Sequence, residues 1–193
     1  MWVKNSKIKE KSNQLYQLKI TLKDIKPAIW RRFEVRSDVM LARLHEYIQV
    51  IMGWDNCHMH QFIIGNVYYG QPHPDYDDMG EQMEDEKKYK LCDLVGVKGK
   101  LMYEYDFGDG WMHEIKVEKM IEAQAGVKYP VCTAGARSCP PDDCGGPWGY
   151  ENMLKILNDP DHDDYEDISD WIGDDFDPEE FDIDEINKTL SKC

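Results

Sequence analysis

Long apolar runs are missing from this sequence. None approaches the roughly 18 residues that a membrane-spanning helix needs, which argues against an integral membrane protein. The glycine-rich motifs that bind nucleotide phosphates are missing too, as are the H-E-x-x-H and G-x-S-x-G motifs of many hydrolases. Residues 1–13 contain lysines but lack the apolar stretch of a secretory signal. We therefore expect a cytoplasmic protein.

Positive charge is scarce and unevenly distributed. The chain of 193 residues has 23 Lys and Arg against 38 Asp and Glu, a net charge of −15. Residues 151–193 hold 16 acidic residues and three lysines, a net charge of −13, whereas residues 1–150 carry only −2. Such a field repels phosphate backbones, which argues against nucleic acid as a partner. The acidic C-terminal segment 159–187 is either a solvated face or a surface for a basic protein partner.

Hydrophobic periodicity predicts strands first and helices later. Alternating apolar residues, with turn residues such as Gly65-Asn66 between some of the runs, predict strands over residues 16–22, 28–35, 61–64, 67–69, 101–107 and 111–117. Helical spacing predicts a helix over residues 41–52 that ends at Gly53. Another helix begins at Gly146-Pro147, and sparse apolar anchors in the acidic tail predict further short helices.

This order of elements predicts an α+β protein rather than alternating βαβ units. We expect a flexible leader over residues 1–13 and a single compact domain over residues 14–193. The domain would have a mainly antiparallel sheet, one long early helix and short C-terminal helices. Residues 71–88 lack apolar periodicity and predict a long mobile loop, and residues 124–147 predict an ordered loop rich in glycine, proline and cysteine.

Two histidines and three cysteines offer metal ligands. His58 and His60 form an H-x-H pattern, and on a strand both imidazoles would point to one face and reach one ion. Cys132, Cys139 and Cys144 lie within 13 residues, although the C-x2–4-C pair typical of structural zinc sites is absent. Zinc binding is one hypothesis for these residues. Ordinary packing, or a reactive thiol at Cys144 before a helix start, are the alternatives.

The stretch YDFGDGWMH gathers further polar residues around a tight turn. Asp106 precedes the turn Gly108-Asp109-Gly110, Asp109 lies in it, and His113 follows on the next strand, on the same face as Trp111. Trp111 and His113 would line a pocket, and His113 would add an imidazole to a metal site. The alternative is that Asp109 bonds the turn backbone, as turn aspartates often do, while His113 is simply half-buried.

Six stretches in order along residues 14–191 together resemble the plasmid pRiA4b ORF-3-like protein family. They are YQLKITLKDIKPAIWRRFEV, LARLHEYIQVIMGW, HMHQFIIG, YEYDFGDGWMHEIKVE, CPPDDCGGPWGYENML and DFDPEEFDIDEINKTL. The resemblance implies a single compact α+β domain and draws attention to three motifs, HMH, DFGDGWMH and CPPDDCGG. It implies no activity, because none is established for the family, although some members are labelled as resolvases of mobile elements.

We predict a binding or interaction module whose pocket forms where these three motifs converge. Its aromatic walls would come from Trp54, Trp111 and Trp148. Histidine, aspartate and cysteine are common ligands of transition metals, which is the chemical reason to expect the convergence.

Two other functions remain open. One is a metal-dependent hydrolase in which imidazoles and a carboxylate hold the ion and a second carboxylate acts as general base. Its residues would be His58, His60, Asp106, Asp109 and His113. The other is a DNA-associated accessory protein, which requires a contiguous basic face. That face would be built from Arg31, Arg32, Arg36 and Arg43.

Overall fold

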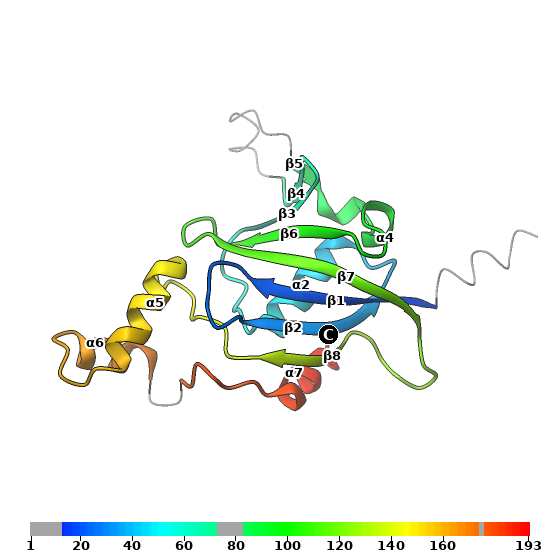
Figure 1. The fold of residues 1–193 in the computed structure, drawn as a ribbon. Helices are drawn as coiled ribbons and strands as arrows, with labels where there is room; N and C mark the ends of the chain where they lie inside the picture. Colours follow the sequence, from blue (N-terminus) through cyan, green and yellow to red (C-terminus); the bar gives the residue numbers. More distant parts are fainter. Residues whose placement is uncertain (1–12, 73–82, 174–175) are drawn as a thin grey trace, which may run out of the picture.

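One mixed but mainly antiparallel sheet organises the computed structural model, which describes residues 13–72, 83–173 and 176–193 (Figure 1). The predicted leader over residues 1–13 lies almost wholly outside the described residues. Eight strands follow the order β5-β4-β3-β6-β7-β1-β2-β8 in this described part. Every neighbouring pair is antiparallel except β4 and β5, which run parallel. The predicted α+β class with a mainly antiparallel sheet is confirmed.

The strands and helices have the following bounds. The strands are β1 (Gln14–Leu22), β2 (Trp30–Arg36), β3 (His60–Ile64), β4 (Val67–Gly70), β5 (Met83–Asp85), β6 (Lys100–Tyr105), β7 (Trp111–Glu122) and β8 (Val131–Ala136). The helices are α2 (Leu41–Met52), the 3₁₀ turn η1 (Glu86–Lys88), α4 (Leu91–Leu94), α5 (Gly146–Leu157), α6 (Tyr165–Ile172) and α7 (Ile183–Leu190).

Alternation of apolar and polar side chains explains the central strands. In β1, Leu18 and Ile20 are fully buried because alternate side chains of a strand point to opposite faces of the sheet. Ile20 pairs with Ile115 of β7 on one side and with Arg31 of β2 on the other. The buried face of these strands is the core against which the long helix packs.

The helix α2 lies against this face of the sheet (Figure 1). Leu41, Leu44, Ile48 and Ile51 are fully buried, as the helical spacing of apolar residues predicts. Gly53 ends the helix in the left-handed conformation, with φ 93°, and its N–H binds the carbonyl of residue 49. The chain then turns toward the residues that carry the candidate site.

The prediction of a loop over residues 124–147 is wrong for β8. This strand has little apolar alternation, and its pairing with β2 fixes it at the sheet edge. The side chain of Asn187 in α7 holds the edge further, because it accepts a hydrogen bond from Cys132 N at 2.7 Å and donates one to Cys132 O at 2.9 Å. Neighbouring elements rather than local pattern therefore create this strand.

The prediction of a loop over residues 71–88 is likewise wrong at its C-terminal end. Met83–Asp85 forms β5 beside β4, and Glu86 in η1 is 1% exposed. Residues 73–82 of that segment lie outside the described residues. A buried carboxylate next to a short edge strand needs a polar partner in the core, and that partner is His60.

The predicted C-terminal helices are confirmed. Pro147 stands in the first turn of α5, and Asp182 caps α7 by accepting hydrogen bonds from the N–H groups of Asp184 and Glu185. In Figure 1, α7 lies beside β8, while α5 and α6 extend from one end of the sheet. Among the described helices, none has the length and apolar character needed to cross a membrane.

Candidate functional site

The loop before β3 meets the turn between β6 and β7. The N–H of Asp106 donates a hydrogen bond to the carbonyl of Met59, which fixes the two segments side by side. His58 Nε2 then lies 3.7 Å from Asp106 Oδ2 and 3.2 Å from Asp143 Oδ1. One residue from each of the three motifs therefore meets the others, and we call the set His58, Asp106 and Asp143 the motif junction.

Turn chemistry aims the carboxylate of Asp106 into this junction. Asp106 has φ 56°, a left-handed conformation that aspartate tolerates better than most residues. Its Oδ1 accepts hydrogen bonds from Gly108 N at 2.9 Å and Asp109 N at 3.4 Å. Asp106 is only 6% exposed, so its second oxygen faces His58 rather than bulk water.

Asp109 has a structural partner instead. Its Oδ2 accepts a hydrogen bond from Gly145 N at 3.1 Å, which joins the DFGDGWMH turn to the start of α5. At Gly146 a Cβ would lie 2.4 Å from the carbonyl oxygen of Asp109, and the residue has φ 69°. Only glycine fits this close approach, so the second motif is locked against the third.

Cys57 and Asp142 lie beside the junction. Cys57 Sγ is 3.7 Å from Asp142 Oδ2, which also accepts a hydrogen bond from Asp55 N at 3.3 Å. Two clusters of three ligand atoms, each within 4.8 Å of one another, occur among the described residues. They are His58–Asp106–Asp143 and Cys57–His58–Asp142.

The two imidazoles of the H-x-H pattern have different partners. His58 precedes β3, so the alternation expected for a strand does not relate it to His60. His60 lies 6% exposed in the core, where Nε2 is 2.8 Å from Glu86 Oε2 and the ring stacks on His45 with centroids 3.3 Å apart. The two imidazoles therefore have separate partners, whereas the H-x-H pattern predicts that both reach one ion.

A buried histidine network, defined here as His45, His60, Glu86, Gln49 and Tyr103, occupies that region. His45 Nδ1 and Gln49 Nε2 both lie 2.8 Å from the Tyr103 hydroxyl. Burial, and then the nearby His60, lowers the pKa of His45 to about 3, so its ring is neutral at pH 7. His45 and Gln49 are polar residues on the buried side of α2. Their positions in the sequence were a signal for this network, but the apolar period over residues 41–52 predicts only a helix.

His113 is fully buried away from both clusters. Its Nδ1 lies 3.2 Å from the carbonyl oxygen of Tyr103, and burial lowers the pKa of the imidazole to about 4. Trp111, also fully buried, packs near Trp54 with ring centroids 5.6 Å apart. Both side chains belong to the core, whereas Trp148 on α5 is 77% exposed and takes no part in an aromatic pocket with them.

The three cysteines do not gather. Within the described residues, Cys132, Cys139 and Cys144 occur in no cluster of three candidate ligand atoms within 4.8 Å. Burial raises the pKa of Cys139 and of Cys144 to about 12, so both are protonated thiols at pH 7. A reactive thiolate at Cys144 is therefore disfavoured, and ordinary packing describes these residues.

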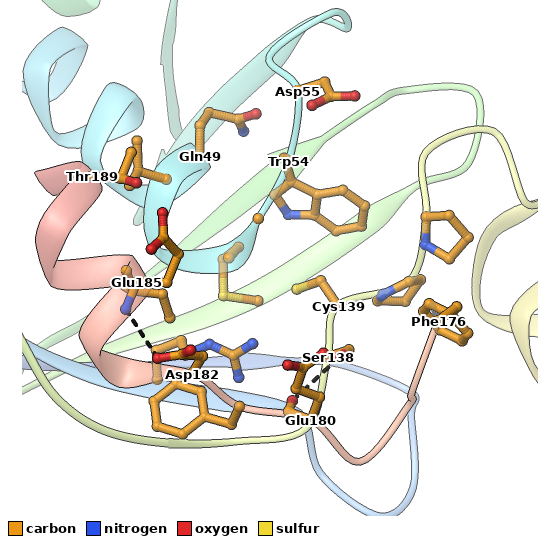
Figure 2. A pocket seen from close by; sticks show the side chains of 18 residues that line it. Gln49, Trp54, Asp55, Ser138, Cys139, Phe176, Glu180, Asp182, Glu185 and Thr189 are labelled. Atoms are coloured by element: carbon orange, nitrogen blue, oxygen red, sulfur yellow. Dashed lines mark hydrogen bonds between the residues drawn. The ribbon is translucent and has the colours of Figure 1, made fainter. Parts of the chain in front are cut away.

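A groove of about 590 Å³ lies between the end of α2, residues 138–141 and α7 (Figure 2). We call it the acidic groove. Its apolar lining includes Val50, Met52, Trp54, Phe176, Phe181 and Ile186. Four carboxylates also line it, namely Asp55, Glu180, Asp182 and Glu185. Figure 2 shows Asp55 and Trp54 on one side, and Asp182 and Glu185 on α7 opposite them.

Two of these carboxylates are free to meet a ligand. Asp182 is used as the cap of α7, and Glu185 is 2.7 Å from Lys188 Nζ. The side chains of Asp55 and Glu180 are exposed and have no hydrogen bond or ion pair within the described residues. The groove is therefore apolar inside and negative at its edge.

A buried arginine supports the groove wall. Arg31 is 3% exposed, and its N–H groups bind the carbonyls of Ile51, Trp30 and Ala136 at 2.8–3.1 Å. Its guanidinium lies 4.7 Å from the ring centroid of Phe181. This cation has neighbours on every side that hold it in place, so it is part of the frame of the groove.

The other predicted basic residues do not form a free face. Arg32 lies 2.6 Å from Glu118, Arg36 lies 3.4 Å from Asp38, and Arg43 pairs with Glu46. Arg31 is buried, as described above. The contiguous basic surface that a DNA-associated function requires is therefore absent from these four positions.

The fold and these sites define a single-domain α+β protein with a groove and a cluster of candidate metal ligands. The chain belongs to the plasmid pRiA4b ORF-3-like protein family, whose model matches residues 14–185. It is 36% identical to the uncharacterized protein y4hQ of Sinorhizobium fredii over 177 residues, covering 90% of this chain and 89% of the relative.

A solved structure shares the fold. The crystal structure of MM3350, a protein of unknown function from Methanosarcina mazei Go1, is similar to this chain with a TM-score of 0.83 and 40% identity. The similarity covers 90% of this chain and 96% of that one. The two chains therefore share the fold, and because a fold does not fix a function, the function must be argued from the site.

Proposed function

We propose that this protein is a binding module that recognises a basic peptide segment of a partner protein through the acidic groove. One observation carries the proposal: an apolar groove with aromatic walls has unpaired carboxylates, Asp55 and Glu180, at its edge. An aromatic or aliphatic side chain of the peptide would enter the groove, and neighbouring Lys or Arg residues would meet the carboxylates.

The charge of the surrounding chain favours the same class of partner. The segment 159–187 contributes 15 of the 38 acidic residues and no Lys or Arg, and its last part lines the groove. A strongly negative surface accelerates association with a cationic segment and rejects anionic ones, which gives specificity more than affinity. A volume of about 590 Å³ also suits one or two anchoring side chains.

Peptide binding measured by fluorescence anisotropy tests the proposal. The probe is a labelled lysine-rich peptide with one central tryptophan, and its counterpart has glutamate in place of each lysine. We expect binding of the lysine peptide only. The double variant Asp55→Asn/Glu180→Gln should weaken it about tenfold, since each exposed charge pair contributes up to about 1 kcal/mol.

The matched control removes the same charge elsewhere. Glu166→Gln/Asp170→Asn changes two exposed carboxylates on α6, outside the groove. We expect the control to bind the peptide within about twofold of the unmodified protein, because distant exposed charges are screened by salt. Equal weakening by both double variants, or no binding of the lysine peptide, would contradict recognition by the groove.

The hydrolase alternative has less support from the arrangement of its residues. His58 and Asp106 lie together, but His60 bonds Glu86 and Asp109 bonds Gly145. His113 is enclosed in the core. We therefore propose the binding module first.

A further inference from the structure

Beyond the groove, the geometry points to a divalent transition-metal site formed by His58, Asp106 and Asp143, the motif junction. These three side chains come from three separate segments, so their approach is a product of the fold rather than of local sequence. The site uses none of the groove carboxylates, so metal binding and peptide binding can be tested independently of each other.

The distances suit a shared ion. Two ligand atoms bound to a tetrahedral Zn²⁺ at about 2.0–2.1 Å lie about 3.3–3.4 Å apart. His58 Nε2 is 3.2 Å from Asp143 Oδ1 and 3.7 Å from Asp106 Oδ2, and the three ligand atoms lie within 4.8 Å of one another. A shift of a few tenths of an ångström would place them around one ion.

The most buried member of the junction has an unused oxygen. The side chain of Asp106 is 9% exposed, and both hydrogen bonds it accepts from the described residues go to Oδ1. Its Oδ2 faces His58 without a hydrogen bond from those residues. His58 Nε2 is itself shielded from solvent and makes no hydrogen bond there. A cation between these atoms would satisfy both.

The surroundings supply access and a neighbouring donor. His58 lines a pocket of about 390 Å³, and Asp143 is 74% exposed, so two of the three ligand residues border space that solvent reaches. Cys57 and Asp142 form a second cluster with His58, so a thiol and a further carboxylate lie within one residue of the proposed ligands. One imidazole with carboxylates is a donor set that first-row divalent ions such as Zn²⁺ and Co²⁺ accept.

Titration of Zn²⁺ into the chelator-treated full chain, measured by isothermal titration calorimetry, tests the site. The absorption spectrum of the Co²⁺-loaded protein reports the coordination of the ion. We expect one Zn²⁺ per chain and a rise in the thermal unfolding temperature. His58→Gln and Asp143→Asn should each weaken binding by at least about 100-fold, because losing a direct ligand costs more than losing its outer partner. Asp143 is 74% exposed, so its variant keeps the fold.

His162→Gln is the matched control. His162 and Asp164 form an exposed histidine–aspartate pair 3.9 Å apart, away from the three motifs. This control should leave Zn²⁺ affinity unchanged, and Cys57→Ser should change it by less than about tenfold, since Cys57 is not one of the three ligands. Absence of a one-to-one Zn²⁺ complex, affinity unaffected in both His58→Gln and Asp143→Asn, or loss confined to Cys57→Ser would overturn the assignment.

Discussion

His58 and His60 are two residues apart, yet they lie in opposite surroundings. His60 is enclosed in the buried histidine network, where Glu86 and a stacked ring fix it. His58 lies at a pocket edge, shares its carboxylate neighbours with no other cation among the described residues, and belongs to the motif junction. Both histidines line the same pocket, so the difference lies in their partners. The comparison teaches that one residue type is fixed by a buried carboxylate and a stacked ring at one position and faces carboxylates nearer the surface two residues away.

The largest effect on the free energy of unfolding should come from removing one member of the buried histidine network. Glu86→Ala removes the acceptor of a 2.8 Å interaction in which both side chains are at most 4% exposed. Breaking one partner of a buried pair leaves the other uncompensated, so we expect a loss of about 3–5 kcal/mol in the free energy of unfolding. Urea unfolding followed by circular dichroism measures it, and a loss below about 1 kcal/mol would show that the pair is not sealed.

Acid should destabilise the core through two buried histidines, His45 and His113. The pKa of His45 is about 3 and that of His113 about 4 in the fold, both below the value of about 6.5 in the unfolded chain. The unfolded chain therefore binds more protons, so this stabilisation is full above pH 6.5 and is lost as pH falls toward 4 and 3. Between pH 6.5 and 5.5 we expect a loss of about 2 kcal/mol from both histidines together.

The variant His45→Gln provides the control for that pH effect. It removes one of the two titrating rings, so the loss between pH 6.5 and 5.5 should fall by about half. Urea unfolding at the two pH values measures the difference. An unchanged pH dependence in His45→Gln would mean that other groups cause the acid sensitivity.

Detaching two motifs from each other should have an intermediate effect. Gly146→Ala places a Cβ 2.4 Å from the carbonyl oxygen of Asp109 at φ 69°. We expect a loss of about 1–3 kcal/mol in the free energy of unfolding. Gly126→Ala, at φ 83° with no atom within 4 Å of the added Cβ, isolates the backbone strain. Equal losses in the two variants would show that the contact with Asp109 contributes nothing.

The smallest effect on stability should come from the motif junction itself. Asp143→Asn changes an exposed side chain, and we expect less than about 0.5 kcal/mol in the free energy of unfolding without metal. Thermal unfolding in the presence of a chelator measures this. A loss comparable to that of Glu86→Ala would place His58 and Asp143 with the structural core and erase the contrast between the two histidines.

Sequence alone predicts the parts of the fold in which a single element carries its own pattern. Residues 16–22 and 41–52 have apolar periods of a strand and a helix, and the structure confirms both. Residues 131–136 carry no such period, since their strand depends on pairing with β2 and on Asn187 of α7. Contacts between distant segments are not encoded in a local period.

The candidate sites were accessible to sequence reasoning only in part. The HMH, DFGDGWMH and CPPDDCGG motifs were singled out, and the fold brings them together. Strand alternation predicts that His58 and His60 point to one face, but β3 begins only at His60, so His58 lies outside the strand. Asp143, Asp55 and Glu180 had no distinguishing spacing, because their roles depend on which loops and helices meet.

The contact between Asn187 and β8 has a consequence for how copies of this protein behave at high concentration. A side-chain amide has the same donor and acceptor as a peptide group, and here it occupies both at Cys132. An incoming strand that tried to extend the sheet at that residue would find the backbone already bonded. By bonding the edge strand at Cys132, α7 therefore opposes edge-to-edge association of the sheet at this residue.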